Sequence, residues 1–159
     1  MYNVETIFLF IFVIMTEEER RNCEGLVYLT WDMFDSPDQP GSGYKFMERE
    51  PALILDKARQ MMQRKMFDIE VAYTSPSYAN KMSYSMNNSH RIGKAILLRV
   101  RCPKKKWDLI HALMALNVHR IAVQKNENHE LIYFDTDDQK ERGFFIWILK
   151  GKYESKRNI

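Results

Sequence analysis

Four histidines are the residues of this 159-residue chain best suited to acid–base chemistry or metal binding, and their settings differ. His90 ends a long polar stretch and comes just before the apolar segment 95–100. Ligands and catalytic groups tend to lie at such loop-to-strand junctions, so His90 is the strongest candidate. The alternative is that His90 hydrogen-bonds the loop and fixes its turn. His111 falls on the apolar stripe of a predicted helix and is expected to be a core or interface residue. His119 begins a predicted strand, and His129 lies in a polar turn.

Cys23 and Cys102 are the only cysteines, and their spacing fits neither a zinc ribbon nor a disulfide-rich framework. They either pair in an oxidising compartment or stay as two small buried hydrophobic side chains. Burial is the preferred interpretation, because free cysteine is usually buried and inert.

The composition is that of an ordinary globular domain. Apolar residues make up 45% of the chain and charged residues 28%, which excludes wholesale disorder and a multi-span membrane protein. Lys and Arg total 24 against 21 Asp and Glu, giving a formal charge of +3. This mild excess permits an anionic partner but demands none.

Residues 7–15 form an apolar run, IFLFIFVIM, that is followed by the glutamates 17–19. A membrane span needs about 20 such residues, so no stable span is expected. The flanks lack the basic residues and the cleavage site of an export signal. The run is either a strand or anchor packed on the domain, or an upstream extension with Met15 as the natural start. We therefore divide the chain into an extension 1–15, one domain 16–150 and a charged tail 151–159.

Hydrophobic periodicity predicts an α+β fold with a small antiparallel sheet and flanking helices. The helices are expected at 16–24, 52–66 and 104–117, the strands at 26–31, 67–73, 95–100, 119–124, 130–135 and 144–149, and the loops at 35–43 and 74–89.

Several segments, read in order, resemble one enzyme family. They are Phe34–Gly43, Met47, Leu55–Arg59, Asn88–Ala95, Arg120–Val123, Leu131–Asp135 and Ile146–Trp147. The set is similar to the zinc D-alanyl-D-alanine carboxypeptidases, especially their small phage and microvirus-type members, from about Tyr28 to Leu149. The resemblance implies a Hedgehog/DD-peptidase fold and hydrolysis of cell-wall peptides by a zinc-activated water. It also implies a virus-encoded protein that acts in the cytoplasm or periplasm of a bacterial host.

The resemblance also assigns the metal positions, and this chain departs from them. The family motif S-x-H-x-x-G-x-A-x-D supplies a histidine and an aspartate to zinc, and a late histidine completes the set. Here His90 keeps the first position, Leu97 stands at the aspartate position, and Tyr133 stands at the late histidine position. Asp135 is retained, as a second metal ligand or a catalytic residue.

The family's substrate loop, whose arginine holds the peptide, corresponds to residues 74–78, and no arginine is present there. Ser75, Ser77 and Tyr78 are therefore the candidate substrate-binding residues.

A catalytic zinc normally has three protein ligands and a water. Leucine offers no lone pair and neutral tyrosine is a poor ligand, so His90 and Asp135 remain, with His129 or Asp137 nearest to complete the set. We therefore expect zinc binding to be weak and the peptidase to be impaired or inactive.

Two other functions compete with the impaired peptidase. One is a non-catalytic pseudo-peptidase that binds cell-wall peptide or glycopeptide, or a viral or host protein. The other is nucleic-acid binding through Lys104–Lys106 and Trp107, although specific nucleic-acid binding is not expected.

Overall fold

One sheet of five strands organises the chain, in the order β1-β2-β4-β3-β5. The strands are β1 (Asp68–Val71), β2 (Ala95–Val100), β3 (Arg120–Lys125), β4 (Glu130–Asp135) and β5 (Phe145–Ile148). The first four strands in the spatial order are antiparallel, and β5 pairs with β3 in parallel. The computed structural model describes residues 25–63, 67–83, 88–125, 129–140 and 145–148.

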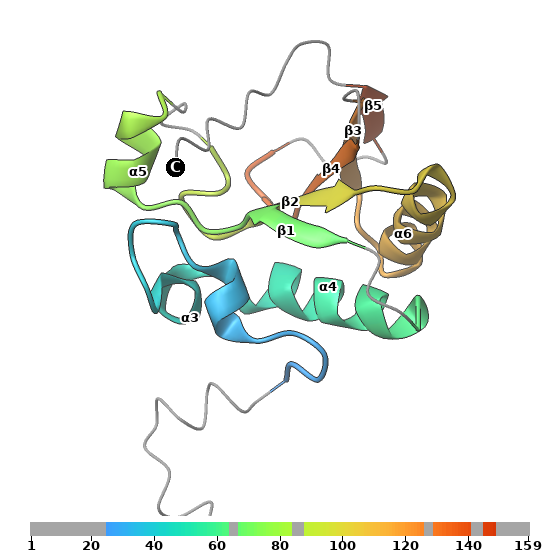
Figure 1. The fold of residues 1–159 in the computed structure, drawn as a ribbon, viewed down its shortest axis with the longest axis horizontal. Coiled ribbons are helices and arrows are strands. Elements are labelled where there is room, and N and C mark those ends of the chain that lie inside the picture. The colour runs from blue at the N-terminus through green and yellow to red at the C-terminus, as the bar shows by residue number, and fades with distance from the viewer. Residues whose placement is uncertain (1–24, 64–66, 84–87, 126–128, 141–144, 149–159) are drawn as a thin grey trace, which may run out of the picture.

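The helices gather mainly on one side of this sheet (Figure 1). They are the 3₁₀ helix η1 (Trp31–Phe34) and the α-helices α3 (Ser42–Phe46), α4 (Arg49–Met61), α5 (Pro76–Lys81) and α6 (Pro103–Ala115). The core lies between the sheet and these helices, and it includes Phe34, Leu55, Leu109, Ile96 and Phe134. Together they form a single α+β domain in which four of the five strands are antiparallel, and the sequence predicts this fold class.

The strand register decides which side chains share a face. Ile96 and Leu98 of β2 belong to the core, and they pair with Phe134 and Ile132 of β4. Because side chains alternate along a strand, Leu97 and its partner on β4 point to the other face of the sheet.

The segment 26–31 is not a strand, which corrects the sequence prediction. The backbone N–H groups of Val27, Tyr28 and Leu29 donate to the buried carboxylate of Asp56 on α4, at 2.9, 2.8 and 2.8 Å. A side chain thus takes the place that a neighbouring strand would fill, and the chain turns into η1 instead of extending.

Further local corrections concern helices. The predicted loop 74–89 contains α5, because Ser75 caps its first turn by accepting the N–H of Tyr78 at 3.0 Å and Pro76 occupies the first helical position. The helix predicted at 52–66 begins earlier, at Arg49, and ends at Met61. The elements expected at 16–24 and 151–159, together with Cys23 and the apolar run, lie outside the described residues.

Two single-residue expectations at α6 need correction. His111 is exposed and does not belong to the core, because the helix buries its neighbours Ile110 and Ala112 instead. Cys102, at the N-cap of α6, is a free and exposed cysteine and not a buried hydrophobic side chain.

Among the helices that the structure describes, none is long and apolar enough to cross a bilayer.

The contact between Asp56 and segment 27–29 makes a testable prediction. Asp56→Asn removes the charge and one of the two acceptor oxygens from a side chain that is 4% exposed. We expect a loss of about 2 kcal/mol in the free energy of unfolding, since buried hydrogen bonds to charged groups contribute this much. Urea denaturation at pH 7 measures the change. The matched control is Lys57→Gln at the next, exposed position; equal midpoints for the two variants would contradict the role of Asp56.

Candidate functional site

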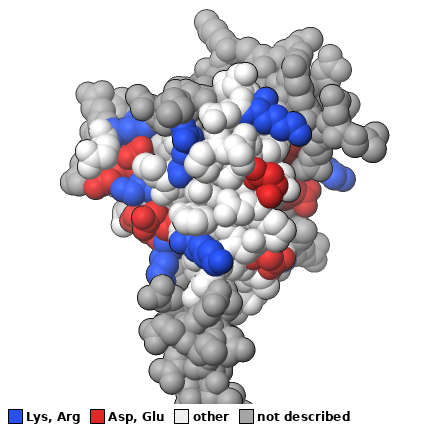
Figure 2. All heavy atoms as spheres, turned by 90° about the vertical axis from the view of Figure 1, so that its left-hand side faces the viewer, with Lys and Arg blue, Asp and Glu red and all other residues white. Residues whose placement is uncertain are grey.

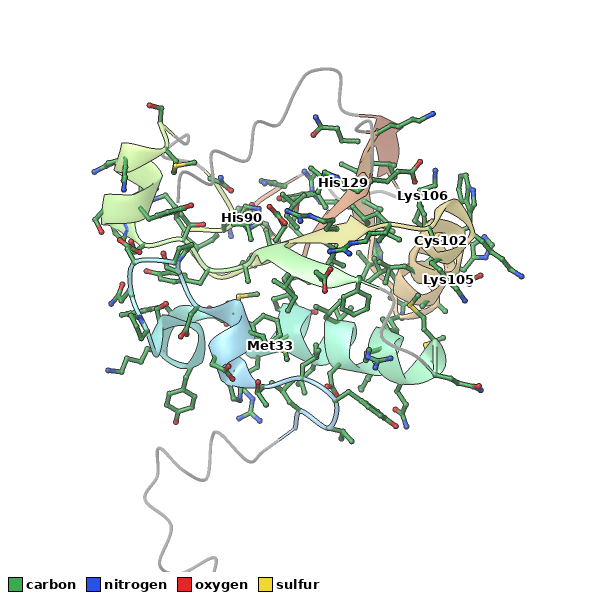
Figure 3. The ribbon with its side chains drawn as sticks, in the orientation of Figure 1. Met33, His90, Cys102, Lys105, Lys106 and His129 are labelled. Atoms are coloured by element: carbon green, nitrogen blue, oxygen red, sulfur yellow. The ribbon has the colours of Figure 1, made fainter. Side chains whose placement is uncertain are left out.

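The turn that carries His90 is fixed by a glycine. Gly93 has φ +71°, and a Cβ built there would lie 2.2 Å from the backbone oxygen of Phe46. The carbonyl of Gly93 also accepts the N–H of Glu48 at 3.0 Å. Only glycine combines this backbone conformation with this close approach. These contacts fix the turn to the junction between α3 and α4, just before β2 begins. His90, which this turn carries, is labelled in Figure 3.

His90 is buried and neutral. Its ring is 4% exposed, and Nδ1 lies 2.8 Å from the carbonyl oxygen of Ala72. Because a carbonyl only accepts, this nitrogen carries the proton. Burial lowers the pKa of His90 to about 4, although the carbonyls of Ala72 and Ala95 and the charge of Asp135 act in the opposite direction.

Tyr133 lies directly beside His90. The two rings meet edge to face, with centroids 5.6 Å apart. The hydroxyl of Tyr133 donates to Oδ2 of Asp135 at 2.7 Å. Burial raises the pKa of the phenol, and the carboxylate of Asp135 raises it further. Tyr133 is therefore a neutral hydrogen-bond donor at this position and not an anionic ligand.

Asp135 is the centre of the site, and its side chain has no exposed area. Its carboxylate accepts from Nε of Arg120 at 3.0 and 3.2 Å and from the backbone N–H of Asp137 at 3.2 Å. The Nζ of Lys140 lies 3.7 Å away. With the bond from Tyr133, these groups satisfy a buried charge that would otherwise be costly. A metal ion at Asp135 would have to displace them.

Asp137 and His129, the two candidates for completing a metal site, lie in different places. Asp137 accepts the hydroxyl of Ser89 at 2.8 Å, so it adjoins the turn of His90. His129 precedes Glu130, which pairs with Val100 at the opposite end of the β2–β4 ladder (Figure 3). The structure therefore brings Asp137 to this site and not His129.

The four positions that the sequence singles out do meet. Leu97 pairs with Tyr133 across β2 and β4, and Tyr133 joins His90 to Asp135. Their donors amount to one imidazole and one carboxylate, and Leu97 is 3% exposed and apolar. In the part of the chain that the structure describes, no group of three or more His, Cys, Asp or Glu side chains is arranged to hold a metal ion.

The two candidate substrate-binding serines, Ser75 and Ser77, hydrogen-bond to a carboxylate within the domain. Ser75 and Ser77 donate their hydroxyls to the carboxylate of Asp38 at 2.7 and 2.6 Å, and Ser36 donates to it at 2.6 Å. Slight burial raises the pKa of Asp38, but the three hydroxyls together lower it to about 2. This cluster ties α5 to the loop 36–38. Tyr78, the third candidate, lies in the first turn of α5 and is half-buried.

A buried hydroxyl next to His90 is left without a hydrogen-bond partner in the part of the chain that the structure describes. The Thr74 side chain is fully buried, and its hydroxyl has no hydrogen-bond partner among the described residues. Its backbone N–H donates to the carbonyl of His90 at 3.1 Å, which places Thr74 next to the candidate site. A buried hydroxyl without a partner costs free energy, so it is a natural point for an internal water molecule to bind.

Sequence reasoning missed Arg120, although a signal for it was present. A hairpin between the strands 120–125 and 130–135 places Arg120 opposite Asp135, and this is the observed register. The contribution of Ser89 and Lys140 had no such signal, because it depends on contacts between distant segments.

The basic start of α6 is largely neutralised. Lys106 lies 2.8 Å from Glu130, Lys105 lies 4.0 Å from Asp108, and Arg101 lies 3.8 Å from Asp68. On the face drawn in Figure 2, basic and acidic side chains are likewise interleaved. Neither observation favours a phosphate-binding surface.

Comparison of the chain with protein-family models, curated proteins and solved structures finds no match.

The buried neutral imidazole predicts a pH dependence of stability. The folded pKa of about 4 lies below the ordinary value of 6.5, so the unfolded chain takes up the proton first as the pH falls. The contribution of His90 is complete above pH 6.5 and is lost towards pH 4, by up to about 3 kcal/mol. Urea denaturation between these pH values measures it.

We expect His90→Asn to flatten this dependence, and His111→Asn, at an exposed histidine, to leave it in place. If His90→Asn does not fold, the NMR titration of the wild-type imidazole gives the same information. A midpoint near 6.5 would contradict the burial argument.

Proposed function

We propose that this chain is a non-catalytic relative of the zinc D,D-peptidases, with a Hedgehog/DD-peptidase-type fold, and that it binds cell-wall peptide without cleaving it. The observation that carries the proposal is the meeting of His90, Leu97, Tyr133 and Asp135 at one end of the β2–β4 pair. These are the positions at which the resemblance places the family's metal site. They converge, yet two of them are no longer metal ligands.

The donor set does not fit a catalytic zinc. Such a site uses three protein ligands and keeps one position for water. His90 can offer at most Nε2, because Nδ1 is bonded to a backbone carbonyl, and Asp135 is held by Arg120 and Tyr133. A neutral phenol that donates to the carboxylate competes with a cation for the same lone pairs. No hydrolytic step therefore follows from these residues.

Retention of a peptide-binding role is supported by what the site still offers. The Thr74 hydroxyl is buried beside His90 and has an unused bonding capacity among the described residues. The turn of His90 is still fixed rigidly by Gly93. A rigid site can bind a peptide without cleaving it, because hydrolysis additionally needs an activated water.

Restoring the two family ligands tests the loss of the metal site. We expect the wild-type chain to contain well under one zinc per molecule, and the double variant Leu97→Asp with Tyr133→His to bind zinc measurably. Elemental analysis before and after chelation measures occupancy. Since a bound ligand stabilises the folded state, added zinc should also raise the melting temperature of the double variant.

The matched control, Leu97→Asn with Tyr133→Phe, changes the same positions without supplying a carboxylate or an imidazole. It should gain neither zinc nor zinc-dependent stability. If the wild-type chain instead holds one tightly bound zinc and hydrolyses cell-wall fragments, the proposal is wrong.

A titration tests the binding role separately. A stem peptide that ends in D-Ala-D-Ala, added to the ¹⁵N-labelled chain, is expected to shift the NMR signals of Thr74 and His90. The same peptide ending in L-Ala-L-Ala should shift them less, because a chiral site distinguishes the two. Equal responses to both peptides, or no response to either, would contradict a cell-wall ligand while leaving the metal experiment unaffected.

A further inference from the structure

A second, smaller pocket lies at the opposite end of the sheet from the candidate site. It has a volume of about 280 Å³ and is formed by the segment 28–33, the last turn of α4 and the start of β1. Asp68, at the start of β1, pairs with Arg99 near the end of β2, whereas the His90 turn leads into Ala95 at the beginning of β2. The pocket therefore shares no residue with the candidate site.

The walls of this pocket are apolar. Tyr28 and Met33 are 49% and 44% exposed, and Met33, labelled in Figure 3, lies on η1 next to the fully buried Phe34. Exposed apolar side chains that meet at one concave place indicate that an apolar group binds there. The hydrophobic and aromatic side chains of the lining are Tyr28, Leu29, Met33, Phe67 and Ile69.

The anchor on Asp56 explains why these elements meet. The carboxylate of Asp56 accepts the backbone N–H groups of residues 27–29, so this segment is held against α4. Arg59 follows Asp56 by three residues on the same helix, and residues at this spacing are neighbours on a helix surface. The guanidinium of Arg59 is thereby brought to the pocket, which it lines.

Arg59 supplies the positive charge of the pocket. It is half-buried, and among the described residues it forms no ion pair. Its place in the last turn of α4 suits a cation, because the helix dipole is negative at that end. The dipole does not by itself provide an acceptor for the N–H donors of the guanidinium. A carboxylate does, since it can accept two parallel hydrogen bonds from this group.

Asp68 is the acidic residue among those that line the pocket. Its charge is offset by Arg101, whose guanidinium nitrogen lies 3.8 Å from the carboxylate. With Arg59, two guanidinium groups therefore lie near one carboxylate. The net charge around the pocket is positive, which favours an anionic ligand.

We propose that this pocket binds a small carboxylate whose apolar group is about the size of one amino-acid side chain. The carboxylate pairs with Arg59, and the apolar group contacts Tyr28, Met33 and Phe67. The volume is close to the lower limit for ligand pockets, so it admits one such group and not an extended segment. A free aromatic acid and the C-terminal residue of a peptide present the same chemistry. This inference does not depend on the peptidase ancestry.

Titration of the ¹⁵N-labelled full chain with 3-phenylpropanoate tests the pocket. The acid is expected to cause saturable shifts of the NMR signals of Leu29 and Ile69. The neutral amide of the same acid should bind about tenfold more weakly, because it cannot form the charge-assisted pair with Arg59. The peptide N-acetyl-Gly-Gly-Phe distinguishes the two sources of the ligand. Tighter binding of this peptide supports a chain end as the ligand, and tighter binding of 3-phenylpropanoate supports a free acid.

Three single variants separate recognition by Arg59 from a general effect on folding. Arg59→Gln should weaken binding of 3-phenylpropanoate about tenfold. Lys57→Gln, at an exposed position of α4 outside the pocket, should leave it unchanged. Asp68→Asn should tighten it, because a negative charge near the carboxylate is removed. Shifts that do not saturate, equal binding of the acid and its amide, or equal binding by the wild-type chain and Arg59→Gln would overturn the proposal.

Discussion

The carboxylate of Asp135 is the interaction on which the rest of the site depends. A charge without any exposed area is tolerated only when every lone pair finds a donor. Arg120 supplies one from the neighbouring strand, Tyr133 one from two residues earlier, and the Asp137 backbone another. The register of the β3–β4 hairpin places Arg120 opposite Asp135. The pairing of these strands and the compensation of the Asp135 charge therefore depend on each other.

This arrangement explains what a tyrosine contributes at position 133. An imidazole at that position would present a lone pair, whereas a phenol presents a proton. The proton points at Asp135, whose negative charge keeps the phenol protonated. The carboxylate is thus satisfied within the domain, and its charge is already compensated without a metal ion. Leu97, opposite Tyr133, adds an apolar side chain that offers no lone pair to a cation.

Much of the fold follows from local sequence signals. The alternation in 67–73 and the apolar run 95–100 predict β1 and β2, and the left-handed Asn117 ends α6 as its residue type suggests. Segment 26–31 is wrongly predicted as a strand. Its residue types favour a strand, but its backbone N–H groups donate to the carboxylate of Asp56, about 27 positions away. Helix α5 is not predicted, because its polar residues are typical of a loop. Ser75 and Pro76 are nevertheless a signal for the start of a helix.

The candidate site, like the fold, is predicted by the sequence only in part. His90 stands out by its position in the sequence, and Arg120 could be derived from the hairpin register. The roles of Ser89 and Lys140 and the unsatisfied hydroxyl of Thr74 depend on contacts across the fold. The exposure of His111 depends on how α6 is rotated about its axis, and Cys102 precedes the helix at its N-cap. Local patterns do not determine such rotations.

Gly93 has a consequence for substitution at its position. Because its backbone touches Phe46 and bonds to Glu48, there is no slack between the His90 turn and the end of α3. Any side chain at position 93 would push the His90 turn away from α3, because its Cβ would meet backbone atoms of Phe46, Met47 and Glu48.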